Sequence, residues 1–138
     1  MNYKVIRRGT PGVPGGGDQK FYASPVYNGE TTIKEIGNRL SAQSAITKAD
    51  AIAVVTGIID LIAADLKDGK IVRLGDLGSF KISLSSNGED TVEQVTSKSI
   101  KSSKVLFRPA KEFQDSLTGL TFTKVRDISA NPEEPVIS

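Results

Sequence analysis

Cations recur at every third residue in one stretch of the second half of the chain, and these side chains are suited to binding an anion. Lys98, Lys101 and Lys104 have this spacing, and Arg108 follows them. Ammonium and guanidinium groups can neutralise phosphates. Because side chains alternate between the two faces of a strand, a spacing of three does not keep them on one face. The pattern therefore fits two interpretations, contact with phosphates or charges that protect an exposed strand edge.

The residue types needed for catalysis or metal binding are scarce. The chain has no histidine and no cysteine, which removes the usual acid–base group near neutral pH and all thiolate ligands. The acidic residues are dispersed on predicted helices or in turns, where solvated charges normally lie. Residues 9–18 are rich in glycine and proline but lack the Lys-Ser/Thr pair of a phosphate-binding loop, so we expect a flexible surface loop. We expect neither an enzyme nor a metal or cofactor site.

Length and charge are those of a small, mildly basic domain. The chain has 138 residues, a net charge of +2 and an isoelectric point near 8.9. Residues 1–29 hold four cations against one acidic residue, a net charge of +3, whereas residues 127–138 hold three acidic residues and no cation. A basic balance is compatible with nucleic acid as a partner. No apolar run reaches the roughly 20 residues that span a bilayer, and no signal-peptide core is present, so we expect a cytoplasmic protein.

Two amphipathic helices are predicted after extended segments at 2–8 and 21–29. Thr32 and Thr47 each begin a helix, because each is followed three residues later by the acidic partner of a capping box. The second helix carries an apolar stripe at helical spacing, which fits either the core of one chain or a core shared between two chains. The stripe consists of Ile52, Val55, Ile59, Ile62 and Leu66.

Short strands are predicted after the second helix, at 70–74, 80–85 and 104–107. Gly75 and Gly78 interrupt the extended pattern, and glycines at such places mark a bulge, a bend or the close approach of another backbone. The sequence further predicts a short helix that begins at Pro109 and a last strand at 120–125.

This order of elements, together with GKIVRLGDLGSF (69–80) and FRPAKEF (107–113), resembles the HU/IHF family of bacterial histone-like DNA-binding proteins. The match runs from about residue 31 to residue 117. It implies an α+β fold in an intertwined homodimer, with two N-terminal helices, a β-saddle with an extended β-ribbon arm, and a short C-terminal helix. Additional N- and C-terminal strands make the chain a longer variant of the family. Gly75 and Gly78 then fall in the bend before the arm, in a structural role.

The resemblance also implies a division of the chain into three parts. We expect an N-terminal extension with a strand and a Gly/Pro-rich loop at 1–29, an HU-like DNA-binding domain at 30–126, and a flexible acidic tail at 127–138.

The arm corresponds to about residues 81–108, and here the sequence departs from the family. The Arg-Asn-Pro motif of the tip is missing, and residues 82–97 contain no Lys or Arg. Acidic residues near phosphates oppose binding, and this half of the arm carries Glu89, Asp90 and Glu93. The expected DNA-binding residues are therefore those of the returning half and the base of the arm, namely Lys81, Lys98, Lys101, Lys104 and Arg108.

The function implied is that of an HU-like protein of the nucleoid. It would bind duplex DNA with low sequence specificity through its β-arms, as a homodimer, without a cofactor, a small-molecule substrate or a membrane partner. Because the outgoing half of the arm lacks cations, an alternative stays open. In this alternative the chain is a structural or protein-interaction module with the HU fold, in which DNA binding is weak or lost.

Overall fold

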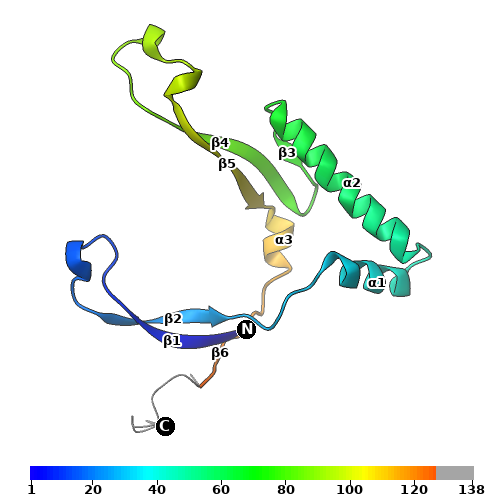
Figure 1. Cartoon of the computed structure of the whole chain (residues 1–138). Coiled ribbons are helices and arrows are strands. Elements are labelled where there is room, and N and C mark those ends of the chain that lie inside the picture. Colours follow the sequence, from blue (N-terminus) through cyan, green and yellow to red (C-terminus); the bar gives the residue numbers. More distant parts are fainter. Residues whose placement is uncertain (127–138) are drawn as a thin grey trace. The chain divides into compact units, whose positions relative to one another are not determined.

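A computed structural model describes residues 1–126, and the expected acidic tail at 127–138 lies outside the described residues. The described chain divides into two compact units (Figure 1). The first comprises Met1–Glu30 together with the segment that begins at Gly119, and the second comprises Thr31–Thr118. The first unit is a small sheet and the second combines helices with another sheet, which gives the mixed α+β class expected from the sequence.

The sheet of the first unit brings together segments that are far apart in the sequence. β1 (Asn2–Arg8) pairs antiparallel with β2 (Lys20–Val26), and the short strand β6 (Thr123–Lys124) pairs parallel with β1. The strand order is β2-β1-β6, so β2 is an edge strand.

The last strand differs from the prediction in length and in place. It is shorter than 120–125, and it groups with β1 and β2 in the first unit. The physical reason is its hydrogen bonding to β1, in which the N–H of Thr123 donates to the carbonyl of Met1 at 3.0 Å and the N–H of Val125 donates to the carbonyl of Tyr3 at 2.9 Å.

Two capping boxes begin the helices of the second unit, as the sequence predicts. α1 (Ile33–Gln43) follows Thr32, and α2 (Lys48–Lys67) follows Thr47. The N–H of Glu35 donates to the Thr32 hydroxyl at 3.3 Å, and the Glu35 carboxylate accepts from the N–H of Thr32 at 3.1 Å. A cap residue of this kind contributes about 1 kcal/mol to stability. Local sequence therefore fixes where both helices start.

A three-stranded antiparallel sheet in the order β3-β4-β5 follows the helices. Its strands are β3 (Val72–Arg73), β4 (Gly78–Ser86) and β5 (Ile100–Pro109), and the short helix α3 (Lys111–Asp115) comes next. β4 and β5 form the long ribbon of Figure 1. β5 begins earlier than the expected 104, because its ladder with β4 continues past a register shift.

Gly75 and Gly78 shape the turn between β3 and β4. Gly75 has a φ of +49°, in the left-handed region that favours glycine. A Cβ at Gly78 would collide with the carbonyl oxygen of Arg108 and lie 2.9 Å from the ring of Phe107. The backbone that comes close to this segment is therefore the end of β5.

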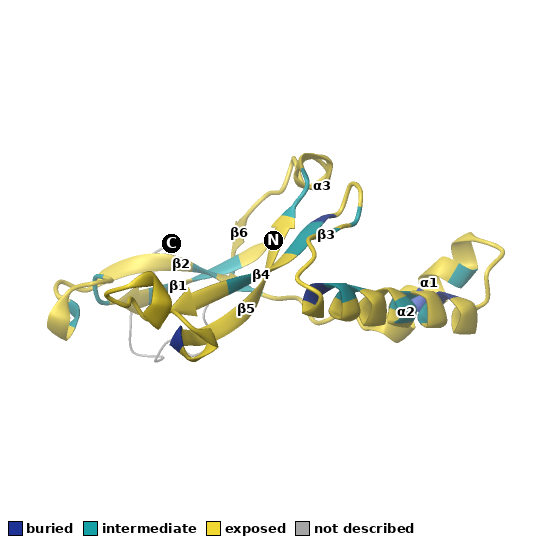
Figure 2. Cartoon of the chain, turned by 90° about the horizontal axis from the view of Figure 1, so that it is seen from above, coloured by how far each residue is buried: buried dark blue, intermediate teal, exposed yellow. Residues whose placement is uncertain are grey.

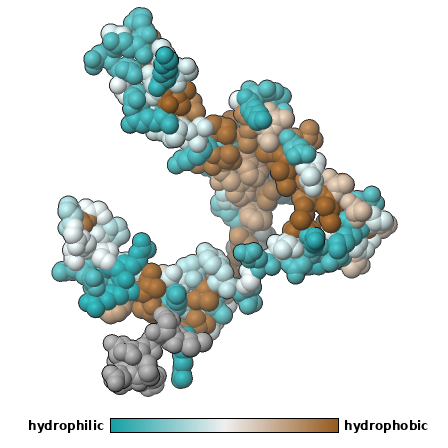
Figure 3. Space-filling model, viewed as in Figure 1, coloured by the Kyte–Doolittle hydropathy of each residue, from teal (hydrophilic) through white to brown (hydrophobic). Residues whose placement is uncertain are grey.

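Few side chains of the second unit are buried. Among the described residues, the buried apolar side chains are Ala51 and Leu66, both on α2, and Figure 2 shows exposure along most of the chain. Ile59, from the middle of the predicted stripe, is 56% exposed. In Figure 3 hydrophobic residues gather over α2 and the neighbouring sheet. One chain by itself does not cover the apolar stripe of α2.

Candidate nucleic-acid interface

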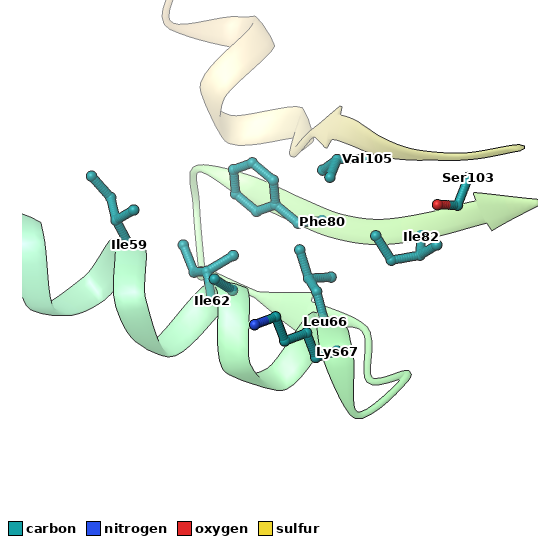
Figure 4. A pocket seen from close by; sticks show the side chains of 9 residues that line it. Ile59, Ile62, Leu66, Lys67, Phe80, Ile82, Ser103 and Val105 are labelled. Carbon is teal, nitrogen blue, oxygen red and sulfur yellow. The ribbon is translucent and has the colours of Figure 1, made fainter.

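The register of β4 with β5 separates apolar from basic side chains. Residues directly opposite each other in an antiparallel pair share a face of the sheet. Phe80 pairs with Phe107, with ring centroids 4.9 Å apart, and Ile82 pairs with Val105. Phe80, Ile82 and Val105 line a hollow together with side chains of α2 (Figure 4). The face that carries these residues is therefore the one turned to α2.

The opposite face of the ribbon carries cations. Lys81 lies opposite Leu106, and Lys104 lies opposite Ser83. Arg108 lies opposite Ser79, two residues before Lys81 and therefore on the same face. These three of the five residues predicted from the sequence share one surface.

A basic hollow of about 580 Å³ opens on this second face, where β3, β4, β5 and α3 meet. Its cationic lining residues are Arg73, Lys81, Arg108 and Lys111, and no acidic side chain lines it. Guanidinium groups offer paired donors that match two oxygens of one phosphate, and ammonium groups act as point charges. The arrangement is suited to a polyanion that lies across the sheet.

Arg73 and Lys111 are residues of this hollow that sequence reasoning missed. Arg73 pairs with Ser79, which places it on the same face as Lys81 and Arg108. Lys111 is the first residue of α3, and only Ala110 separates it from the end of β5. In the sequence, Arg73 lies just before the glycine turn and Lys111 lies just after the Arg-Pro segment. These positions could have suggested a basic site, but Arg73 and Lys111 come together only through the pairing of β3 and β5 with β4.

Lys98 and Lys101 lie elsewhere on the arm. Lys98 belongs to a short 3-10 helix, η3 (Ser97–Ser99), near the tip. Lys101 lies at the register shift, because Ser102 pairs with Ser85 and Ile100 pairs with Ser86. A residue at a bulge has no cross-strand partner, so the regular alternation of faces stops at Lys101.

The tip of the arm is compact and acidic. Ser99 is only 3% exposed, and its hydroxyl donates to the Glu89 carboxylate at 2.8 Å. The side-chain oxygen of Gln94 accepts from the N–H groups of Asp90 and Thr91, both at 3.2 Å. Val92 is 83% exposed beside these carboxylates. Residues 82–97 also contain no Lys or Arg, so this part of the tip has no cation that could bind a phosphate.

The hollow between α2 and the ribbon is apolar and open, with a volume of about 630 Å³. Ile59, Ile62 and Leu66 of α2 line it from one side, and Phe80, Ile82 and Val105 line it from the other (Figure 4). The same ribbon thus presents a basic face on one side and an apolar face on the other.

Neither a metal centre nor a membrane span is found in the part of the chain that the structure describes. Within residues 1–126, no group of three or more His, Cys, Asp or Glu side chains could hold a metal ion. No described helix combines the length and the apolar character needed to cross a membrane.

Comparison with known proteins gives one family and several relatives. Residues 1–124 match the family model described as an HU domain fused to wHTH, Ig, or Glycine-rich motif. Over 49 residues, or 36% of its length, the chain is 33% identical to the DNA-binding protein HRL18 of Rhizobium leguminosarum, and equally to that of Rhizobium radiobacter. The match covers 54% of each relative, so the chain spans about half the length of the curated relatives it matches.

Two solved structures have a similar fold. One is HU of Anabaena in a cocrystal with DNA, with a TM-score of 0.50 and 18% identity over 65% of this chain and 100% of that one. The other is a putative bacterial DNA-binding protein from Bacteroides vulgatus, with a TM-score of 0.59 and 12% identity over 90% of this chain and 48% of that one. At these identities the likeness is one of fold.

Proposed function

The chain belongs to the family of HU domains fused to a winged helix-turn-helix, Ig or glycine-rich motif, and from this premise we propose that it binds duplex DNA with little sequence specificity. The HU-like DNA-binding fold and the relatives named as DNA-binding proteins support a DNA partner. HU-family proteins are architectural and not enzymes. We expect this one to act in the cytoplasm, at the nucleoid.

The observation that carries the proposal is the basic hollow of the second unit. Arg73, Lys81, Arg108 and Lys111 line it without an acidic neighbour in the lining, and Lys104 extends the same face along the arm. Contacts of Lys and Arg with phosphates hold a protein on the duplex but carry no sequence information. Binding through such a surface follows charge and shape and is largely independent of sequence.

The arm extends the basic face, but its tip contributes little to binding the duplex. Lys98 and Lys101 supply charge near the tip, outside the shared face. The compact tip carries Glu89, Asp90 and Glu93, and carboxylates repel phosphates. We infer that the base of the arm contributes most of the binding.

A homodimer follows from the apolar face of the same ribbon. Full burial of a large aliphatic or aromatic side chain contributes roughly 1.5–3 kcal/mol. Ile59, Ile82 and Val105 line the apolar hollow and are exposed in one chain, and a second copy would cover them. Two copies would also double the number of cations offered to DNA.

The proposal is tested by matched pairs of charge removals in the full chain. Lys81→Ala with Arg108→Ala removes two cations from the basic hollow, and Lys34→Ala with Arg39→Ala removes two exposed cations from α1. We expect the first variant to lower the affinity for mixed-sequence duplex roughly tenfold or more, and the second to change it little, as measured by fluorescence anisotropy. Equal affinities of the two variants would reject the hollow as the binding site.

The acidic, compact tip supports one alternative function, a protein-interaction module with the HU fold. Val92 and Val95 are exposed there among the acidic residues, and no cation lies on the outgoing strand beyond Lys81. If the wild-type chain fails to bind duplex even at low salt, this alternative takes the place of DNA binding.

A further inference from the structure

The β1–β2 ribbon of the first unit carries cations and aromatic rings side by side. Arg7 lies directly opposite Phe21, and Arg8 lies opposite Lys20. Neither strand contains an acidic residue. Figure 3 shows hydrophilic and hydrophobic residues interleaved along this ribbon.

Both faces of the ribbon end combine an aromatic ring with positive charge. Arg7 and Phe21 share one face, since they are paired, and Arg8 shares the other face with Lys20 and Tyr22. Phe21 is 72% exposed, and the three cations are exposed as well. The Phe21 ring is therefore largely uncovered within its own unit and lies beside the cation of Arg7.

The end of the ribbon is closed by a loop that is joined by hydrogen bonds within itself. The N–H of Thr10 donates to the carbonyl oxygen of Gly16 at 2.6 Å, and the Thr10 hydroxyl donates to the carbonyl of Asp18 at 3.0 Å. A Cβ at Gly9 would lie only 2.5 Å from the Gly16 carbonyl oxygen, so the two glycine backbones touch. Asp18 is the one acidic residue within residues 1–29.

We propose that this ribbon end is a second nucleic-acid contact and that it takes single strands. Surfaces that bind single strands combine cations along the phosphate backbone with aromatic rings on which unpaired bases stack. Arg7, Arg8 and Lys20 supply the charge, and Phe21 and Tyr22 supply the rings. The bases of a duplex are already stacked on one another, so an exposed phenylalanine ring favours a strand whose bases are free. This site shares no residue with the basic hollow proposed for duplex DNA.

A protein partner fits the ribbon end less well. An apolar partner would leave three clustered cations without counter-charges at the contact. Addition of another strand to β2 is opposed by Pro25, because proline lacks the N–H donor of a ladder and is typical of edge strands that stay unpaired.

The test compares a short oligo-dT strand with a mixed-sequence duplex, both bound to the full chain. Phe21→Ala removes the ring, whereas Phe21→Leu keeps an apolar side chain without a π-face, and Phe21→Tyr keeps the ring. We expect Phe21→Ala and Phe21→Leu to lower the affinity for oligo-dT roughly 5- to 100-fold, and Phe21→Tyr to retain it. Arg7→Ala with Arg8→Ala should weaken the same complex at least as much, and Lys34→Ala with Arg39→Ala should not.

The outcomes distinguish the ribbon end from the basic hollow. Lys81→Ala with Arg108→Ala should weaken duplex binding and spare oligo-dT binding, so the two proposals fail separately. If the Phe21 and Arg7/Arg8 variants bind oligo-dT as the α1 control does, the ribbon is not a binding site for single strands. Equal losses for oligo-dT and duplex would make the ribbon a general phosphate contact, and a changed oligomeric state of Phe21→Leu would make it a protein contact. Either result overturns the assignment.

Discussion

The backbone at Gly78 lies so close to the carbonyl oxygen of Arg108 that no side chain fits between them. Gly78 also has a φ of +143°, which residues with a side chain rarely adopt. The contact joins the start of β4 to the end of β5 and holds Arg108 at the basic hollow.

Gly78→Ala should therefore destabilise the protein. Strain at such a φ and overpacking at the contact together lower the free energy of unfolding by about 2–4 kcal/mol. Urea denaturation measures the change. Gly88→Ala is the matched control, because a Cβ there meets open space, and it should stay within about 0.5 kcal/mol of the wild type. Equal stability of the two variants would contradict the close approach.

The two cations that sequence reasoning missed should matter more than the two near the tip. Arg73→Ala with Lys111→Ala removes charge from the basic hollow, whereas Lys98→Ala with Lys101→Ala removes the same charge outside the shared face. We expect the first pair to weaken duplex binding severalfold more than the second in a fluorescence anisotropy titration. The reverse order would place the DNA along the returning strand and not on the hollow.

The apolar face of α2 should hold two chains together. Ile59→Asp puts a carboxylate at the apolar hollow, where its burial in a dimer would cost several kcal/mol. Sedimentation should show a dimer for the wild type and a monomeric or unfolded chain for this variant. Ala53→Asp introduces the same charge at an exposed position of α2 that does not line the hollow, and it should remain dimeric. A well-folded monomeric wild type would exclude the shared core.

The tip of the arm should not kink DNA. Proteins that kink the duplex insert an apolar wedge held by neighbouring cations, whereas Val92 and Val95 lie among carboxylates. An energy-transfer assay on a duplex labelled at both ends should show little bending, and Val95→Ala should leave the signal unchanged. Strong bending that disappears in this variant would show that the tip inserts.

The features that the sequence predicts well are local ones. Thr32 and Glu35 are three residues apart, so the capping box could be identified without knowledge of the fold, and the structure confirms it. The close approach at Gly78 was one of the alternatives that the sequence predicted, but its partner could not be named, because Arg108 comes thirty positions later in the chain.

The features that the sequence analysis missed depend on long-range pairing. Arg73 joins the basic hollow only because the two-residue strand β3 pairs with β4. The last strand belongs with the first because Thr123 bonds to Met1, a pairing between the two ends of the described chain. The place of Lys101 depends on a register shift between Ser85 and Ser86, which becomes visible only once β4 is paired with β5.

The salt dependence of duplex binding tests the central claim most directly. Each phosphate neutralised on the duplex contributes about 0.9 to the slope of log affinity against log salt. Three or four contacts from each of two chains predict a slope of roughly −5 to −7, and Lys81→Ala with Arg108→Ala should make it shallower by about 3 to 4. A slope near zero for the wild type, or an unchanged slope in the variant, would contradict an electrostatic interface at the basic hollow.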